Sequence, residues 1–488
     1  MNIVAALLCL GIHAGDLAGQ SPIDTLALRA HTYFLSHDLL EGRATGSAGA
    51  HTAALYIVSQ CRALGLQPVA GRYLHTFPLE EASVVPSTRL TVTHGASQAA
   101  FQYSRDFTPD MGTVSTLIGF RGSTIYVGGL RDVAAGSLRN VDVTGAVAVA
   151  LGAANNLAAI DTLKARGAVG ILHLVPDQRT YRLYRSSRGN TRLHHADSTV
   201  ESSFLPKLPS VIAGPNLSYD LVAATPLARG EAMSPGPLGL DVEYELELHR
   251  RSFEAGNVTC LLPGSSNVAA DTAIAYSAHY DHLGIGIPDE HGDSIYNGFS
   301  DNAAGVAMLL AIAKAMVSDT AHPMRHSALF LFFTGEERGL LGSDYYASHP
   351  AWALAKTRAV INLDAGAPAG IPTSWRLAGV DTAGIGTVAL QIGSERGWQI
   401  TTSPARANSD YYPFVREGVE ALFLVPGPGH YEGLSTDSSN ALRKRWDSYH
   451  RPGDEWHGDF PFLGLERYAE YAYLIGRAID DRVAPQRP

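Results

Sequence analysis

Apolar residues in the second half of the chain fall into short continuous runs, and stretches with apolar residues at helical spacing lie between them. Continuous apolar runs are typical of strands that are buried on both faces of a sheet. Alternation of such strands with helices is typical of a mostly parallel sheet with helices on both faces. We therefore predict an α/β fold with a mostly parallel, mixed sheet. The predicted strands are Val242–Leu248, Val258–Leu262, Ala273–Ser277, Ser327–Phe333, Ala359–Leu363 and Ala421–Val425, and the predicted helices lie at about 302–318, 382–396 and 461–482.

The beginning of the chain has a different pattern. Residues 24–66 have the spacing of two helices, the first ending near Glu41-Gly42-Arg43 and the second closed by Gly65. Residues 68–110 alternate short β-like runs, such as Arg89–Thr93, with turns.

Residues 112–236 show a separate pattern in which strand-like runs alternate with turns. This pattern predicts an inserted, mainly β unit. Because its ends lie in Gly- and Pro-rich turns, we expect this segment to fold when it is expressed alone. A polar loop is expected up to about residue 204, and an exit linker at Pro226–Leu240. The expected strands are Ser123–Val127, Gly145–Leu151, Val169–Val175 and Leu208–Ile212, with one helix at Asn156–Arg166.

The first residues resemble a secretory signal peptide. Ile3–Gly11 is almost wholly apolar, and the small residues around Leu17–Gln20 are typical of a cleavage region. This predicts a protein that is secreted or periplasmic; the alternative is a buried N-terminal helix. Cys9 would leave with such a peptide, and Cys61 and Cys260 would remain, either paired or free.

Composition narrows the class of protein. The chain has 37 Lys and Arg against 47 Asp and Glu, a net charge of −10, and no long basic run, so nucleic acid is not an expected partner. Its 3 cysteines are too few for a disulfide framework or a cysteine-based zinc site, whereas 19 histidines offer imidazole ligands. Beyond the first residues no apolar run approaches the length of a bilayer span, so no stable membrane span is expected. The sequence does not determine the oligomeric state.

Acidic residues and a histidine follow three of the predicted buried strands directly. Parallel strands of an open α/β sheet place their carboxyl ends, and the ligands that bind there, at one edge. So many acids at one edge repel each other unless a cation lies between them. The sequence therefore predicts a metal site at this edge. The residues in question are His279, Asp281, Glu336, Glu337 and Asp364.

Asp301 precedes an apolar predicted helix and could cap its N-terminus, but beside the other acids a metal-bridging role is the better interpretation. His279 and Asp281 are two residues apart, so on an extended strand they would share a face, and the carboxylate would fix the tautomer of the imidazole. His450 lies in a loop and is not marked by its local sequence. His282, His291 and His430 are interpreted as surface residues or pocket rim.

Three motifs together resemble the co-catalytic zinc aminopeptidases, a family that includes the bacterial leucyl aminopeptidases and has the glutamate carboxypeptidases and glutaminyl cyclases as relatives. The resemblance extends over about 240–480, and Leu39–Gly46 resembles the N-terminal part of the larger bacterial members. It implies a zinc exopeptidase fold in which residues 112–236 resemble an inserted protease-associated domain. The motifs are His279–Gly284, Asn297–Gly305 and Thr334–Ser343. The implied division is a signal peptide at 1–20, the N-terminal part of the peptidase domain at 21–111, the insertion at 112–236 and the catalytic domain at 237–488.

The resemblance also implies two zinc ions per chain and a role for each site residue. Asp301 would bridge the two ions, Glu337 and His450 would complete one metal, and His279 and Asp364 the other. Asp281 would orient His279, Glu336 would be the general base acting on a metal-bridging water, and Tyr449 would stabilise the oxyanion. Ala365-Gly366-Ala367 and Phe299-Ser300 depart from the usual family residues without removing a ligand.

The resemblance implies a secreted zinc aminopeptidase that hydrolyses N-terminal residues from peptides. One alternative is a carboxypeptidase or dipeptidase on the same site, which would need a cationic pocket; Arg406, Arg443 and Arg451 are unassigned. The others are a glutaminyl cyclase, which uses a single zinc ion, and a non-catalytic binding protein that kept the fold.

Overall fold

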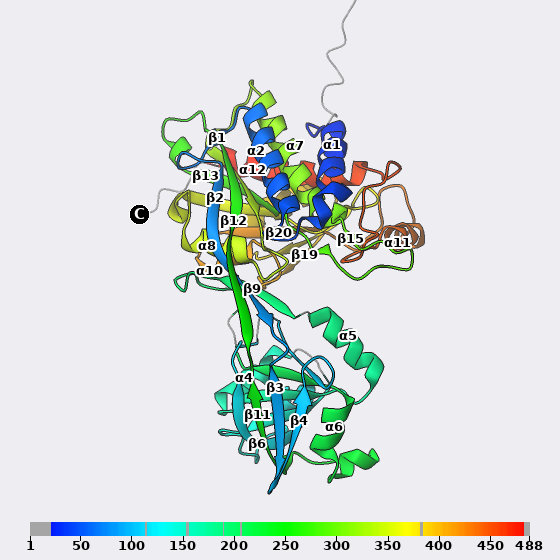
Figure 1. The fold of residues 1–488 in the computed structure, drawn as a ribbon. Coiled ribbons are helices and arrows are strands. Elements are labelled where there is room, and N and C mark those ends of the chain that lie inside the picture. Colours follow the sequence, from blue (N-terminus) through cyan, green and yellow to red (C-terminus); the bar gives the residue numbers. More distant parts are fainter. Residues whose placement is uncertain are drawn as a thin grey trace, which may run out of the picture. The chain divides into compact units, whose positions relative to one another are not determined.

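The computed structural model describes most of the chain, which folds into two compact units. The predicted signal peptide at 1–20 lies outside the described residues. The chain passes into the second unit along β2 (Leu74–Val84) and returns along β12 (Leu248–Leu262) (Figure 1). The described residues are 21–112, 115–152, 156–188, 190–204, 207–380 and 384–482. The first unit comprises Met1–His75, Asn257–Thr334 and Pro350–Pro488, and the second comprises Thr76–Gly256 and Gly335–His349.

The first unit is built on a mixed sheet whose central strands are parallel. Its strands follow the order β19-β18-β20-β17-β13-β16-β12. β13 pairs in parallel with β16 and β17, and β17 with β20, whereas β12 and β18 each join antiparallel to their inner neighbours. The α/β fold with a mostly parallel, mixed sheet is therefore confirmed. The strands are β13 (Ala273–His279), β16 (Ser327–Phe333), β17 (Thr357–Leu363), β18 (Ser374–Ala378), β19 (Gln399–Ser403) and β20 (Ala421–Pro426). The short strand β1 (Gln67–Pro68) pairs with β12, and the short strands β14 (Gly284–Ile285) and β15 (Ile295–Tyr296) pair with each other.

Helices cover both faces of this sheet. On β16, Phe330 and Phe332 join the core formed with α7, α9 and α12, whereas the next side chain along the strand, Phe333, points to the other face. There its ring lies 6.1 Å from that of Phe414 on α10. The helices of this unit are α1 (Thr25–Leu35), α2 (Ala48–Ala63), α7 (Ala304–Ser318), α9 (Ile385–Glu395), α10 (Tyr412–Arg416), α11 (Thr436–Arg445) and α12 (Leu463–Asp481), with 3₁₀ turns η1 (Asp38–Arg43), η3 (Ala269–Asp271) and η5 (Leu354–Lys356) and the π turn η4 (Phe299–Ala303).

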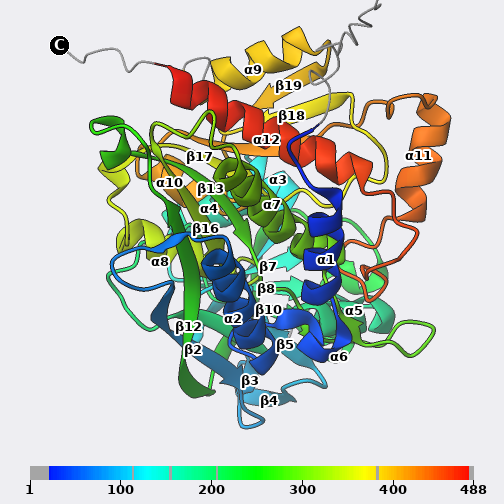
Figure 2. The same ribbon diagram turned by 90° about the horizontal axis from the view of Figure 1, so that it is seen from above.

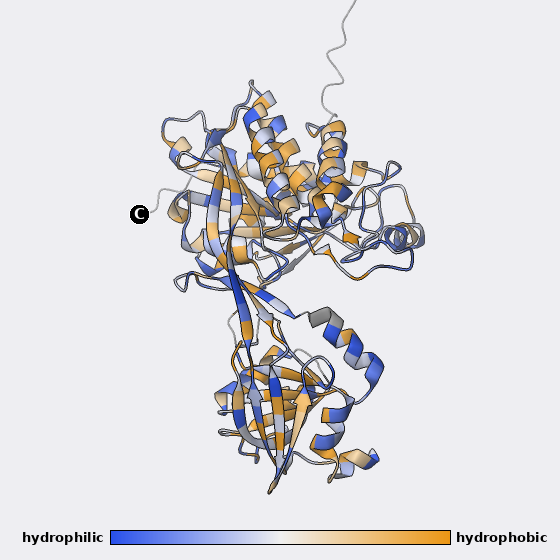
Figure 3. Cartoon of the chain, viewed as in Figure 1, coloured by the Kyte–Doolittle hydropathy of each residue, from blue (hydrophilic) through white to orange (hydrophobic). Residues whose placement is uncertain are grey.

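The helix α7 is the most apolar of the described helices of the first unit and is coloured mainly as hydrophobic in Figure 3. Together with η4 it forms a segment, Phe299–Ser318, that is long and apolar enough to cross a bilayer, a run that the sequence-based expectation did not include. This segment is 78% buried inside the structure, and α7 contacts α1, α12 and β13 (Figure 2). Its apolarity is therefore accounted for by its place in the core.

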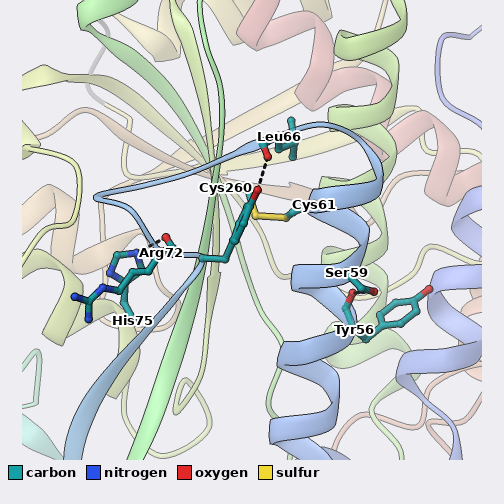
Figure 4. The surroundings of a disulfide bond; sticks show 8 residues. Tyr56, Ser59, Cys61, Leu66, Arg72, His75 and Cys260 are labelled. Carbon is teal, nitrogen blue, oxygen red and sulfur yellow. Dashed lines mark hydrogen bonds between the residues drawn. A yellow bond between two sulfur atoms is a disulfide. The ribbon is translucent and has the colours of Figure 1, made fainter.

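The N-terminal helices differ in one respect from the prediction. The helix α1 ends at Leu35, and the residues up to Arg43 form the separate turn η1, in which Glu41 and Gly42 have positive φ. The second helix, α2, is joined to β12 by a disulfide bond between Cys61 and Cys260 (Figure 4). The state of these two cysteines, open at the level of sequence, is therefore decided by the fold.

The second unit contains an eight-stranded sheet of order β4-β3-β11-β6-β7-β8-β10-β5. It takes in more of the chain than the predicted insertion 112–236, because β3 and β11 pair with each other and β11 also pairs with β6. The predicted linker Pro226–Leu240 is partly wrong, since β11 begins at Gly236. The strands of this sheet are β3 (Arg89–His94), β4 (Ser97–Gln102), β5 (Phe107–Pro109), β6 (Phe120–Gly129), β7 (Val147–Leu151), β8 (Gly170–Leu174), β10 (Ser210–Ala213) and β11 (Gly236–Glu245). The strand β9 (Thr191–His195) pairs with β2 instead.

Part of the predicted polar loop in this unit is ordered structure. The helix α5 (Gln178–Arg188) and the strand β9 lie where a loop was expected. α5 is coloured largely as hydrophilic in Figure 3, so it lacks the apolar periodicity by which a helix is recognised. The other helices of the unit are α3 (Leu130–Ala134), α4 (Leu157–Ala165), α6 (Pro215–Val222) and α8 (Leu341–Ser348), with the 3₁₀ turn η2 (Pro226–Arg229).

Candidate metal centre

The carboxyl ends of two adjacent strands carry the first two residues of the centre. His279 is the last residue of β13, and Asp364 comes directly after β17. Because β13 and β17 are parallel neighbours, with Ser277 opposite Asn362, both side chains arrive at the same edge of the sheet. Asp301 joins them from the turn before α7. Ligand atoms of the three residues lie within 4.8 Å of one another.

Asp301 lies between two imidazoles. Its Oδ1 is 3.2 Å from Nε2 of His279, and its Oδ2 is 3.1 Å from Nε2 of His450. On its other side, His279 Nε2 is 2.8 Å from Oδ1 of Asp364. α7 is capped by Ala303 without a side-chain hydrogen bond, so the N-cap interpretation of Asp301 is not supported. The peptide bond between Asp301 and Asn302 is cis.

The electrostatics of the three buried groups are strongly coupled. Burial by itself would lower the pKa of His279, but the charge of Asp364 and hydrogen bonds with Asp281 and Asp301 raise this pKa well above its ordinary value. Burial would raise the pKa of Asp301, yet hydrogen bonds with His279 and His450 hold it well below its ordinary value. Burial raises the pKa of Asp364. Carboxylates this close together repel each other unless a cation lies between them, and imidazole and carboxylate are ligands that zinc accepts. The donor set therefore fits zinc.

Asp281 contacts His279 from the loop that follows β13. The strand ends at His279, so the expectation that the two residues share one strand face is wrong. Instead, the chain turns back: His279 Nδ1 is 3.1 Å from the main-chain oxygen of Asp281 and 3.7 Å from its Oδ1. Both oxygens favour a proton on Nδ1, which leaves Nε2 free to act as a ligand.

A second set of buried polar side chains holds Asp364, and the sequence did not mark them. Ser409 donates a hydrogen bond to Oδ2 of Asp364. Asn362 donates to Ser409 over 2.6 Å, and Ser277 donates to Asn362 over 2.7 Å. The one available signal was a polar residue, Asn362, inside an otherwise apolar strand.

Asp454 holds the backbone at Asp301 in place by hydrogen bonds. Its carboxylate accepts hydrogen bonds from the backbone N–H groups of Ser300, at 2.9 Å, and Asp301, at 3.1 Å. The loop that carries His450 is thereby tied to the turn that carries Asp301. Asp454 lies four residues after His450, but nothing in the local sequence distinguished it from a surface acid.

His282 is the clearest correction among the candidate residues. It was expected at the surface or at a pocket rim, but it is fully buried. Its ring centroid lies 5.6 Å from that of His450, so it lines the centre. His291 and His430 are exposed.

Three further residues were predicted for this centre, namely Glu336, Glu337 and Tyr449. Glu336 and Glu337 follow β16 and Thr334 in the chain, but they begin the segment Gly335–His349 that belongs to the second unit. Their roles as base and ligand stay predictions. Tyr449 is 66% exposed, and its ring stacks on that of His450 at 3.8 Å. Its role at the oxyanion also stays a prediction.

Comparisons with known proteins show what the chain is similar to. Residues 257–460 match the model of peptidase family M28. The chain is 31% identical over 189 residues to the "probable leucine aminopeptidase 2" of Aspergillus oryzae (strain ATCC 42149 / RIB 40), a match that covers 34% of this chain and 36% of that protein. It is 23% identical over 237 residues to "Aminopeptidase YwaD" of Bacillus subtilis (strain 168), covering 45% and 43%. The chain thus spans about a third of the length of the first of these relatives and less than half of the other.

Solved structures are similar over almost the whole chain. The aminopeptidase from Aneurinibacillus sp. strain AM-1 is 17% identical, with a TM-score of 0.56 over 93% of both chains. BSAP, a zinc aminopeptidase from Bacillus subtilis, is 16% identical, with a TM-score of 0.50 over 94% of this chain and 95% of that one. At these identities the likeness establishes the fold. Together with the family match it confirms the resemblance to the co-catalytic zinc aminopeptidases.

Proposed function

We propose that the chain is a zinc-dependent aminopeptidase, starting from the match of residues 257–460 to the model of peptidase family M28. In this proposal it removes N-terminal residues from peptides and holds two zinc ions. One observation carries the proposal. The two carboxylate oxygens of Asp301 face two different imidazoles, those of His279 and His450. A carboxylate in that position can bind one cation through each oxygen.

The proposed ligands divide between the two ions. His279 and Asp364 would hold one, Glu337 and His450 the other, and Asp301 would bridge them. When bound, zinc supplies Lewis-acid polarisation of the scissile carbonyl and lowers the pKa of water. Asp281 orients His279, and Ser409 fixes the outer oxygen of Asp364, so that its Oδ1 faces the centre.

Glu336 is proposed as the general base. It takes a proton from the attacking water as the oxygen adds to the carbonyl carbon. It then passes this proton to the amine nitrogen as the carbon–nitrogen bond breaks. Tyr449, next to His450, is proposed to donate its hydroxyl proton in a hydrogen bond to the developing oxyanion.

Export from the cytoplasm is part of the proposal. A disulfide bond such as that between Cys61 and Cys260 persists in oxidising compartments, which supports the interpretation of residues 1–20 as a signal peptide. The insertion at residues 112–236 is proposed to be a protease-associated domain.

A carboxypeptidase would need a free cation for the substrate carboxylate. Arg443 is engaged by the carbonyl of Gly429 and lies 4.4 Å from the ring of Tyr431, so it is not available for this purpose. Arg406 and Arg451 are exposed. The carboxypeptidase therefore stays an alternative, which the substrate panel decides.

The test combines metal content with a substrate panel. Purified protein should contain two zinc ions per chain, and a chelator should abolish hydrolysis of aminoacyl arylamides until zinc is returned. The variant His450→Ala should lose one ion in preference to the other. Cleavage only of peptides with a free C-terminal carboxylate would indicate a carboxypeptidase, and glutaminyl cyclisation with one zinc ion would indicate a cyclase. Binding of both ions by His450→Ala would overturn the ligand assignment.

A further inference from the structure

The turn Arg43–Thr45 lies more than two hundred residues before the metal centre in the sequence, yet it contacts the chain beside two of the proposed ligands. The Arg43 side chain is completely buried. Its Nε donates a hydrogen bond to the carbonyl of Tyr280 over 2.7 Å, directly after His279. Its two terminal nitrogens donate to the carbonyls of Asn297, at 2.6 Å, and Gly298, at 2.9 Å, shortly before Asp301.

A buried guanidinium is costly unless its N–H groups are hydrogen-bonded. The guanidinium of Arg43 also donates a hydrogen bond to the carbonyl of Leu35 at the end of α1. It therefore binds carbonyl groups of three separate chain segments. A single rigid group therefore fixes the loop after β13 relative to the loop before η4. The backbone contributes as well, because the N–H of His282 donates to the carbonyl of Arg43 over 3.2 Å.

The preceding glycine allows this close approach. Gly42 has φ +66°, and a Cβ atom at this position would lie 2.5 Å from the carbonyl oxygen of Tyr296 and 2.6 Å from that of Gly284. Any other residue would push the turn away from the strands β14 and β15. The turn is thus built to lie against the loops of the centre.

Thr45 contacts the centre through Asp281. Its hydroxyl donates a hydrogen bond to Oδ2 of Asp281 over 2.8 Å. The other oxygen of that carboxylate, Oδ1, lies 3.7 Å from Nδ1 of His279. The hydroxyl therefore selects the orientation of the carboxylate in which one oxygen faces the imidazole.

We infer that the turn Arg43–Thr45 positions the metal centre. Arg43 sets the relative position of the two chain segments that carry His279 and Asp301, and Thr45 orients His279 through Asp281. Both are positioning residues that act through others. The inference rests on the proposed function in that the group held by His279 is taken to be zinc.

The variant Thr45→Val tests the second half of this inference, because it keeps the shape of the side chain and removes the donor. Zinc affinity, measured by competition with a chromophoric chelator, should fall about ten-fold, at the low end of the 10–100-fold effect of groups behind a metal ligand. Thermal unfolding of the metal-free protein should stay close to wild type. Thr45→Ser should restore the affinity. Thr52→Val removes a hydroxyl that bonds within α2, and it should leave the affinity unchanged.

A double-mutant cycle separates positioning from a general structural effect. If Thr45 acts through Asp281, Thr45→Val should lower zinc affinity in the wild-type background and have no further effect in the Asp281→Ala background. Arg43→Lys should lower the affinity more than Thr45→Val, because an ammonium cannot reproduce the planar fork. If Arg43→Lys does not fold, the Thr45 cycle decides alone.

The two proposals fail in different ways. Wild-type zinc affinity in Thr45→Val, or an equal loss in both backgrounds, would overturn the positioning role while leaving the peptidase intact. A wild-type chain that takes up no zinc would overturn the proposed function itself.

Discussion

Four of the five proposed ligands are held by neighbours that contribute no ligand atom. Asp301 and His450 are 149 residues apart, and Asp454 brings them together by accepting hydrogen bonds from the backbone beside Asp301. Ser409 and Asp281 do the same for Asp364 and His279. Preorganisation of this kind keeps the carboxylates close together at a cost that a bound cation offsets.

At the scale of single residues, the adjacent glutamates should separate catalysis from metal binding. Glu336→Gln keeps the size of the side chain but cannot accept a proton, so turnover should fall by on the order of 10²–10⁴. Its zinc content, measured by atomic absorption, should stay at the wild-type value. Glu337→Gln should instead lose zinc together with activity.

Two outcomes would contradict these roles. Near-wild-type turnover in Glu336→Gln would place the base elsewhere. Loss of zinc from Glu336→Gln, with zinc retained in Glu337→Gln, would mean that the two glutamates exchange roles.

At the scale of elements, the ends of β13 and β17 place the centre, and the N-terminal helices α1 and α2 are packed beside it. Between these helices lies His31, whose Nδ1 is 2.9 Å from the hydroxyl of Tyr56. Burial, with a smaller contribution from the charge of Lys314, lowers the pKa of His31 from 6.5 to about 4, and Asp24 opposes this shift. The folded chain therefore keeps His31 neutral.

This predicts a loss of stability on acidification. Between pH 6.5 and about 4 the unfolded chain binds a proton at His31 that the folded chain does not, so the free energy of unfolding falls as the pH falls through this window. The loss reaches on the order of 3 kcal/mol. His31→Gln cannot titrate and should lose less, as measured by urea unfolding at pH 7 and pH 4.5.

The exposed His51 on α2 offers a matched control, and His51→Gln should keep the pH dependence of the wild type. An identical pH dependence in His31→Gln and the wild type would refute the buried, neutral state of His31.

At the scale of the whole molecule, the disulfide bond between Cys61 and Cys260 joins residues 199 positions apart in the sequence. Such a cross-link restricts the unfolded chain, and its loss typically costs about 2–5 kcal/mol. A reducing agent should therefore lower the denaturant midpoint of the wild type by the corresponding amount. The double variant Cys61→Ala/Cys260→Ala should show the lower midpoint with and without reductant. A wild-type midpoint that does not respond to reductant would argue against the bond.

The limits of the second unit lead to a separate prediction. Residues 76–256 should fold when expressed alone, whereas 112–236 should not, although it was the segment expected from sequence. The shorter segment lacks buried core residues, each contributing roughly 1.5–3 kcal/mol; these are Leu90, Val92, Phe107, Val242 and Tyr244. Circular dichroism and limited proteolysis of both products would check this. A folded 112–236 would show that β3 and β11 are dispensable.

The sequence alone determined the type of fold and the edge at which the centre lies. Continuous apolar runs mark strands that are buried on both faces, and polar residues directly after such runs must lie at the carboxyl edge of a parallel sheet. His279 and Asp364 could be placed together for this reason. The order of the three motifs added the resemblance to a family of zinc enzymes.

Only the tertiary structure decided which distant residues support the ligands. The local sequence around Ser409 and Asp454 does not indicate their contacts with the centre. The segment Leu39–Gly46 was part of the family resemblance, but the contacts of Arg43 and Thr45 within it were not predicted. The local sequence likewise did not predict that His282 is buried or that β11 pairs with β3. Hydrophobic periodicity reports whether a segment has a buried face, but it does not report which part of the chain covers that face. A buried hydrogen bond between distant segments is specified by the folded chain as a whole.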